Sequence, residues 1–309
     1  MRLHLFVPFL LPVLGTALLL QALKEIPRAL LTKFTLFSQY SAASTCRGNH
    51  NSTSVGSPVY CGVESCPLIS AADTEILFGF SNIDPGDTAG YLAADHTNGL
   101  LIISFRHTMT MANVITDWTI SQVDASAACS GCLAHKGYWS AAVAVGQVLK
   151  RPIRHAKARY PDYGLAVTGH SLGGALATLY AVSLRNEGYN ADFYTFGAPS
   201  IGNYVFAEFI TNMSDSDRGR NYRITHLNDE VPKVLYRTSR APALNLVVAE
   251  YSQSGPEYWI TSAFEEPVTT ADIQVLEGVN NEGGNLGREL GSLRDHLWYF
   301  GPTSFCLMP

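Results

Sequence analysis

The pentapeptide Gly169-His170-Ser171-Leu172-Gly173 constrains the fold of this chain more than any other feature. An apolar, β-branched segment at 165–168 precedes it, and a proline-free run of helix formers at 174–184 follows it. Strand, sharp turn and helix are the context in which a G-x-S-x-G serine stands exposed as a nucleophile, with the N–H groups of the helix directed at it. The same pentapeptide also fits a glycine-rich turn with a solvated serine. The assignment of Ser171 therefore depends on finding partners for it elsewhere in the chain.

The surrounding pattern alternates between strands and helices. A helix is predicted at 33–43 and a largely helical segment at 138–160. Such alternation is typical of an α/β fold with a mostly parallel central sheet and helices on both faces. No proline- or serine-rich linker divides the chain, so we expect one domain over 33–309. Strands are predicted at 100–105, 165–168, 192–196, 221–227 and 245–251.

The first 22 residues are predicted to be a signal peptide. A short positive leader precedes an apolar stretch at 5–20, which is shorter than the ~20 residues that a spanning helix needs. A retained membrane anchor is the alternative. Residues 23–32 are a pro-segment or the start of the mature chain. We therefore expect a secreted, extracellular protein, and Asn51 and Asn212, each in an N-x-S/T sequon, are candidate glycosylation sites.

Secretion also changes the interpretation of the six cysteines. In an oxidising compartment an even number indicates three disulfides, for which 15 pairings exist. The C-x-x-C pair has no second pair or H-x-x-x-H motif beside it, which argues against zinc. Local closure favours two short loops and leaves one bond to tie the chain ends together: Cys61–Cys66, Cys129–Cys132 and Cys46–Cys306.

A serine hydroxyl needs a base to take its proton and an acid to orient that base. In α/β proteins with this motif the acid and then the histidine follow the serine in the chain. Only His226 and His296 come after Ser171, and His226 lies within a predicted strand, so His296 is the predicted base. Asp229 is the predicted acid, because it follows a strand at the edge where active sites gather. Other candidates for the acid are Asp192, Asp215, Asp217 and Glu230.

Two backbone donors are expected for an oxyanion. One is the N–H of Leu172, directly after the serine, and the other is Thr108, in the loop after the strand at 100–105. Beyond Thr108 an amphipathic helix is predicted over 109–118, which we expect to act as a lid over the site. An ordinary core helix is the alternative. The predicted apolar face of this lid includes Met109, Met111, Val114 and Ile115.

Taken together, these residues resemble the secreted filamentous-fungal triacylglycerol lipases of class 3, of the Thermomyces and Rhizomucor type. The resemblance runs from Phe34 to Leu307 and implies an α/β-hydrolase-type fold with a short helical lid. The segments that carry it lie, in order, at 39–43, 95–98, 104–106, 129–132, 168–175, 195–199, 222–226, 256–260 and 296–300.

The resemblance implies that Ser171, Asp229 and His296 form the catalytic triad, with Thr108 and Leu172 as the oxyanion hole. It implies the disulfide pairing favoured above, no cofactor and no metal, and an acylglycerol ester as substrate at a lipid–water interface. No protein partner is expected, and the net charge of −5 argues against nucleic acid. The chain departs from the family at His107, where glycine is usual, at Val114, where the lid often has tryptophan, and in a longer stretch at 282–294.

Two other functions fit parts of this pattern. A feruloyl or other soluble-ester esterase shares the scaffold, although the apolar face predicted for 109–118 disfavours it. A non-catalytic lipid-binding protein would not need the serine, the aspartate and the histidine together. The sequence therefore predicts a serine ester hydrolase that acts on acylglycerols through an acyl-enzyme.

Overall fold

An eight-stranded sheet organises the chain in the computed structural model, which describes residues 25–62, 66–107, 121–215, 217–240, 250–304 and 306. Its strand order is β1-β2-β3-β6-β7-β8-β9-β10. The central strands β3, β6, β7, β8 and β9 run parallel, and β1, β2 and β10 are antiparallel at the two edges. The strands are β1 (Thr74–Ile83), β2 (Thr88–Asp95), β3 (Leu100–Phe105), β6 (Gly164–His170), β7 (Ala191–Phe196), β8 (Asn221–His226), β9 (Glu257–Ile260) and β10 (Ile273–Leu276).

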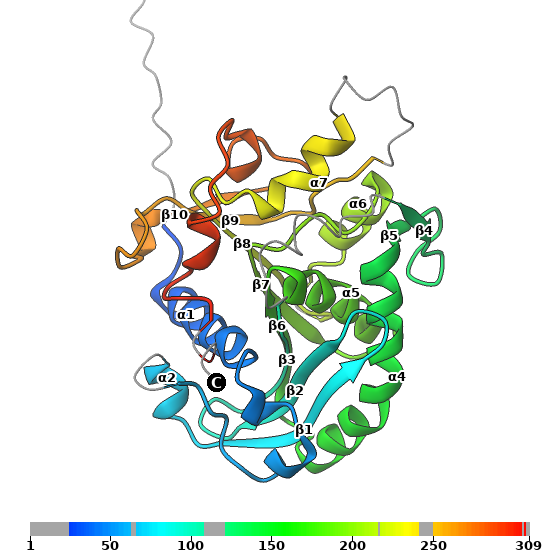
Figure 1. The fold of residues 1–309 in the computed structure, drawn as a ribbon, viewed down its shortest axis with the longest axis vertical. Coiled ribbons are helices and arrows are strands. Elements are labelled where there is room, and N and C mark those ends of the chain that lie inside the picture. The colour runs from blue at the N-terminus through cyan, green and yellow to red at the C-terminus, as the bar shows by residue number, and fades with distance from the viewer. Residues whose placement is uncertain are drawn as a thin grey trace, which may run out of the picture.

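Helices cover both faces of this sheet (Figure 1). One face packs against α1, and the other packs against α4 and α5. A mostly parallel sheet between two helical layers is the predicted fold class, and the structure confirms it. The remaining elements are α1 (Arg28–Ala43), α2 (Pro67–Ser70), α4 (Lys136–Arg159), α5 (Leu172–Asn186), α6 (Tyr204–Asn212), α7 (Val231–Arg240) and a small second sheet of β4 (Gln122–Asp124) and β5 (Leu133–His135).

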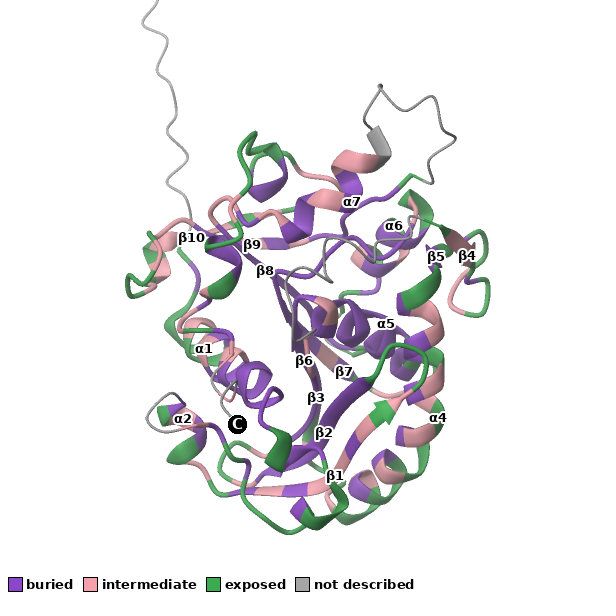
Figure 2. Ribbon diagram, in the orientation of Figure 1, coloured by how far each residue is buried: buried purple, intermediate pink, exposed green. Residues whose placement is uncertain are grey.

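The core lies on both sides of the parallel strands, as the buried ribbons in Figure 2 show. Five of the six residues of β3 are buried, and α5 directs a nearly continuous apolar surface at β6 and β7. Strands buried on both faces need apolar side chains on both, which is why the segment at 100–105 is apolar without alternation. This core holds the carboxyl ends of β6, β7 and β8 side by side.

One predicted boundary differs from the structure. The first helix begins at Arg28 rather than at 33, and Ile26 before it is buried against the same core as Phe34. The strand expected at 245–251 lies mostly outside the described residues, because 241–249 are not described. The predicted signal peptide at 1–22 also lies outside them. Within the described part of the chain, no helix has the length and apolarity that a bilayer span requires.

Three disulfides join the cysteines, in the pairing expected from the sequence: Cys46–Cys306, Cys61–Cys66 and Cys129–Cys132. The first closes a loop of 260 residues in sequence separation. A cross-link of this span restricts the unfolded chain strongly, and the loop-entropy model assigns it a contribution of about 4–5 kcal/mol. It ties the segment after α1 to the chain end that follows His296.

Candidate active site

Ser171 occupies a sharp turn between β6 and α5. Its φ of 55° and ψ of −127° place it in a backbone region that side-chain-bearing residues rarely adopt. The turn is tight because the flanking glycines touch: a Cβ on Gly169 would lie 2.3 Å from the carbonyl carbon of Gly173. The N–H of Ser171 donates to the carbonyl of Phe196 at the end of β7. The neighbouring strands therefore hold the strained residue in place.

Asp229 and His296 form a buried pair next to this turn. The Nδ1 atom of His296 lies 2.8 Å from Oδ2 of Asp229, and both side chains are fully buried. Asp229 follows the carboxyl end of β8, and the N–H of Val231 donates to its Oδ1 atom at 2.9 Å. The pair has the geometry in which a carboxylate orients an imidazole, leaving its Nε2 atom to act on a substrate.

The hydroxyl of Ser171 and the Nε2 atom of His296 are both buried, and among the described residues neither has a hydrogen-bond partner. No hydrogen bond joins these two atoms in the structure. Contacts between a nucleophile and its base are often long in an unliganded enzyme and tighten when substrate binds. Ser171 is 2% exposed, and its hydroxyl oxygen is buried.

Glycine at position 197 makes room for the Asp229–His296 pair. Its φ is +59°, and a Cβ there would lie 2.7 Å from Oδ2 of Asp229 and 2.8 Å from Nδ1 of His296. Gly197 directly follows β7, so the strand end can pass against the pair only without a side chain. The sequence offered a signal for this contact, because the segment Gly197-Ala198-Pro199 follows a predicted strand.

Tyr299 is a further member of the site that sequence reasoning did not identify. Its hydroxyl donates to Oδ2 of Asp229 at 2.5 Å, the same oxygen that faces His296. Burial, and then the negative charge of Asp229, raise the pKa of Tyr299 well above its ordinary value, so the hydroxyl stays protonated and remains a donor. The sequence feature that could have identified Tyr299 is its position, three residues after His296.

His170 supports the base from the other side. Its Nε2 atom lies 2.8 Å from the backbone carbonyl of His296, and the two rings are 4.3 Å apart between centroids. Burial, followed by the nearby His296 and His107, holds the pKa of His170 well below its ordinary value. A neutral His170 can donate one N–H to that carbonyl without placing a second positive charge beside the base. His170 is therefore a positioning residue.

The turn that carries Asp229 is fixed by the long stretch at 282–294. The ammonium of Lys233, which is fully buried, donates to the carbonyls of Asn228, Arg288 and Leu290. The side-chain amide of Asn285 donates to the carbonyl of Asp229 at 2.9 Å. These bonds join the turn that carries Asp229 to the segment that leads into His296. Lys233 and Asn285 were not singled out from the sequence.

The other candidates for base and acid have different roles in the structure. Both ring nitrogens of His226 lie within 3.1 Å of backbone carbonyls, those of Asp295 and Ser262, so this ring is already engaged. Asp192 accepts from the N–H of Arg220, and Glu230 lies 3.4 Å from Arg237 and 3.6 Å from Lys233. None of these groups is joined to His296 by a hydrogen bond among the described residues.

The predicted oxyanion hole and lid are described only in part. Leu172 opens α5, so its N–H belongs to the first turn of the helix, where backbone donors have no helical partner. His107 precedes the gap in the described chain and packs edge-on against His170, with 5.3 Å between ring centroids. Thr108, Met109, Met111, Val114 and Ile115 lie outside the described residues. In the described part of the chain, no three His, Cys, Asp or Glu side chains are grouped as metal ligands would be.

Comparison with known proteins gives a consistent set of matches. The model of the family described as lipase (class 3) matches residues 102–239. Secreted mono- and diacylglycerol lipase A of Penicillium cyclopium is 36% identical over 90% of this chain and 87% of its own length. The crystal structure of a mono- and diacylglycerol lipase from Aspergillus oryzae superposes with a TM-score of 0.78 at 36% identity, covering 88% of this chain and 97% of that one. Rhizomucor miehei triacylglyceride lipase superposes with a TM-score of 0.74 at 27% identity, covering 92% and 99%.

Proposed function

Because the chain belongs to the class 3 lipase family, we propose that it hydrolyses the ester bonds of acylglycerols through a covalent acyl-enzyme. The observation that carries the proposal is the buried contact of 2.8 Å between His296 and Asp229, beside the strained turn that presents Ser171. A serine hydroxyl, an imidazole and a carboxylate in this order are the parts that acyl transfer needs.

In the proposed reaction, Ser171 Oγ attacks the ester carbonyl carbon while Nε2 of His296 takes the hydroxyl proton. The carbonyl oxygen becomes an oxyanion, which the N–H groups of Leu172 and Thr108 stabilise; each such donor is worth about 2.7–4 kcal/mol in the barrier. The intermediate collapses, and the alcohol leaves with the proton from His296. A water molecule, deprotonated by His296, then attacks the acyl-enzyme and releases the fatty acid.

Asp229 has two roles in this scheme. Its carboxylate holds Nδ1–H of His296, so that Nε2 is free to accept the serine proton, and it stabilises the imidazolium that results. Tyr299 and the N–H of Val231 share the charge of this carboxylate and fix its plane. We propose that the segment at 109–118 covers the site in water and opens at a lipid surface, which agrees with the burial of Ser171.

We expect the rate to rise abruptly when the substrate exceeds its solubility. If an apolar cover must open, an emulsion surface favours the open form and dissolved monomers do not. The measurement is the initial rate against tributyrin concentration on both sides of the solubility limit. Simple saturation without a rise would instead indicate the soluble-ester esterase.

Mono- and diacylglycerols are candidate substrates alongside triacylglycerol. The sequence resemblance points to triacylglycerol lipases, whereas the Penicillium and Aspergillus relatives are named mono- and diacylglycerol lipases. We propose acylglycerols as the substrate class. The relative rates on triolein, diolein and monoolein under identical emulsion conditions would assign the preference within it.

We further propose that the protein is exported, with the N-terminal 22 residues removed. Three disulfides and the relatives named as secreted support this, and Asn51 and Asn212 are both exposed, as glycan acceptors must be. The intact mass of protein from culture medium, before and after deglycosylation, checks both points. A mass that retains residues 1–22 would contradict export by cleavage.

A further inference from the structure

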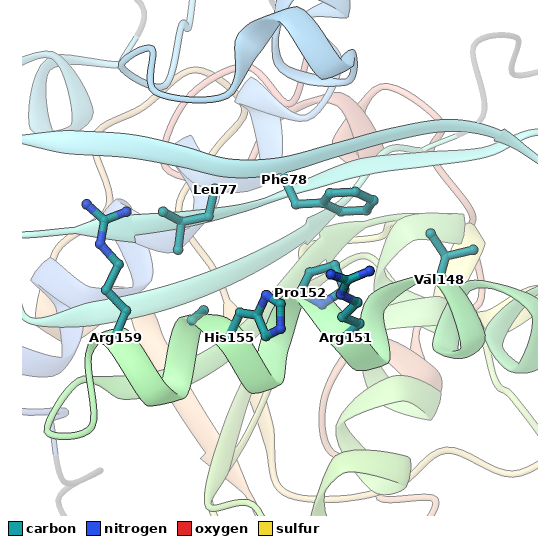
Figure 3. Close-up of a pocket in the computed structure, with 8 residues that line it drawn as sticks. Leu77, Phe78, Val148, Arg151, Pro152, His155 and Arg159 are labelled. Atoms are coloured by element: carbon teal, nitrogen blue, oxygen red, sulfur yellow. The ribbon is translucent and has the colours of Figure 1, made fainter.

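A groove runs between β1 and the second half of α4, on the outer part of the sheet (Figure 3). Its volume is about 470 Å³, within the roughly 300–1,000 Å³ of small-molecule sites. Apolar side chains form its floor and three basic side chains stand along it. The lining residues are Leu77, Phe78, Val148, Arg151, Pro152, His155, Ala156 and Arg159.

The floor is an apolar strip that the fold leaves partly uncovered. Leu77 and Phe78 of β1 are half-buried against α4, and Val148 and Pro152 are half-buried on the facing side. Apolar surface of this kind gains free energy when a further apolar group removes it from water. The strip lies between a strand and a helix, along which an extended hydrocarbon chain can run.

The ionisable side chains that line the groove are all basic. The second half of α4 contains Lys150, Arg151, Arg154, His155, Lys157 and Arg159, and the helix has no acidic residue, although the whole chain has a net charge of −5. Arg159 is held by Glu75 at 3.2 Å. Within the described residues, Arg151 and His155 make no ion pair and no side-chain hydrogen bond. An anionic group near the middle of the groove would therefore meet a cation that no carboxylate neutralises.

We infer that this groove binds the anion of a free long-chain fatty acid, with the acyl chain along Leu77, Phe78 and Val148 and the carboxylate at Arg151 and His155. An extended apolar chain with a single negative head matches both the floor and the charges. The choice of a fatty acid among anionic amphiphiles rests on the proposed function, because ester hydrolysis releases it.

The groove is separate from the site at Ser171. Phe78 in the groove pairs with Leu92 of β2, which lies level with the middle of β6, whereas Ser171 follows the carboxyl end of β6. β1 is also the outermost strand of the sheet, three positions from β6. An acid bound here does not occupy the space in front of the catalytic residues.

Photolabelling of the full-length protein tests this inference directly. The probe is palmitic acid with a diazirine in its chain, used below its micelle concentration, and the adducts are located by peptide mass mapping. We expect adducts on the peptides that contain Leu77–Phe78 and Val148–Ala156. Adducts confined to peptides around Ser171, or spread evenly over the surface, would overturn the inference.

Matched variants of the same helix separate a specific site from general adsorption. Val148→Asp puts a carboxylate against the apolar floor and the anion, so labelling of the groove falls about tenfold. Arg151→Ala removes one exposed cation and lowers it about threefold. Val143→Asp and Arg154→Ala, which change exposed residues of α4 outside the groove, leave it unchanged.

Two competitors identify the source of the anion. Free laurate is expected to compete for the groove, whereas dodecanol, which lacks the charge, competes at least threefold less well. Anionic phospholipid vesicles that protect the groove better than laurate would overturn the inference in favour of membrane docking. Ester hydrolysis assays are independent of this labelling, so failure of the proposed function is seen separately from failure of the groove to bind.

Discussion

Replacing Ser171 by alanine is expected to lower kcat on tributyrin by about 10⁶-fold, the loss found when a serine nucleophile of this type is removed. The reason is that, among the described residues, no other hydroxyl is placed at the strained turn between β6 and α5 with the Asp229–His296 pair beside it. Initial rates on an emulsion measure the effect. Labelling of the parent protein at Ser171 by an organophosphonate, located by mass spectrometry, supports it independently.

Folding of the Ser171→Ala variant should be unaffected. The hydroxyl of Ser171 is buried and has no hydrogen-bond partner among the described residues, so its removal breaks no bond. Ser41→Ala is the matched control, since Ser41 in α1 has an equally buried hydroxyl without a partner in the described structure. Both variants should unfold within a few degrees of the parent, and only Ser171→Ala should lose activity. Hydrolysis by Ser171→Ala within tenfold of the parent rate would refute the assignment.

Sequence alone was sufficient for four of the five parallel strands, β3, β6, β7 and β8. The strands at 100–105 and 165–168 are largely continuous apolar or β-branched runs, as expected of parallel strands that are buried on both faces. The strands at 192–196 and 221–227 mix such residues with polar ones. The parallel strand β9 and the antiparallel strands β1, β2 and β10 were not predicted. β2 contains glycine, three alanines and an aspartate, and β9 has only four residues, so both depend on pairing with distant segments rather than on local preference.

In the site, too, some residues could be predicted from local sequence and others depend on contacts with distant segments. Ser171, Asp229 and His296 were identified because chain order and strand ends restrict each choice to a few residues. Lys233 could not be identified, since a lysine in a helix is normally solvated. It is buried only because the loop at 288–290, more than 50 positions later, supplies two of its three carbonyl partners. Tyr299 likewise gains its role only when the chain end meets the turn after β8.

Replacing Asp229 by asparagine is expected to lower kcat by about 10⁴-fold with little change in KM, as for a triad whose acid loses its charge. The N–H of Val231 donates to Oδ1, so the single oxygen of an asparagine is drawn to that position. Its amide nitrogen then faces Nδ1 of His296 and donates to it. The imidazole is thereby held with its proton on Nε2, where it cannot accept the proton of Ser171. Stopped assays on p-nitrophenyl esters measure the loss.

Two further variants separate this tautomer effect from damage to the fold. Asp95→Asn changes another fully buried carboxylate that accepts from a tyrosine, Tyr40 at 2.7 Å, so it should destabilise the protein without a comparable loss of kcat. Tyr299→Phe keeps the carboxylate and removes one donor, which should cost about ten- to hundredfold, in line with about 1.5–3 kcal/mol for a hydrogen bond to a charged group. If Asp229→Asn and Asp95→Asn lost activity equally, the carboxylate at 229 would be structural and the proton path from Ser171 would have to run elsewhere.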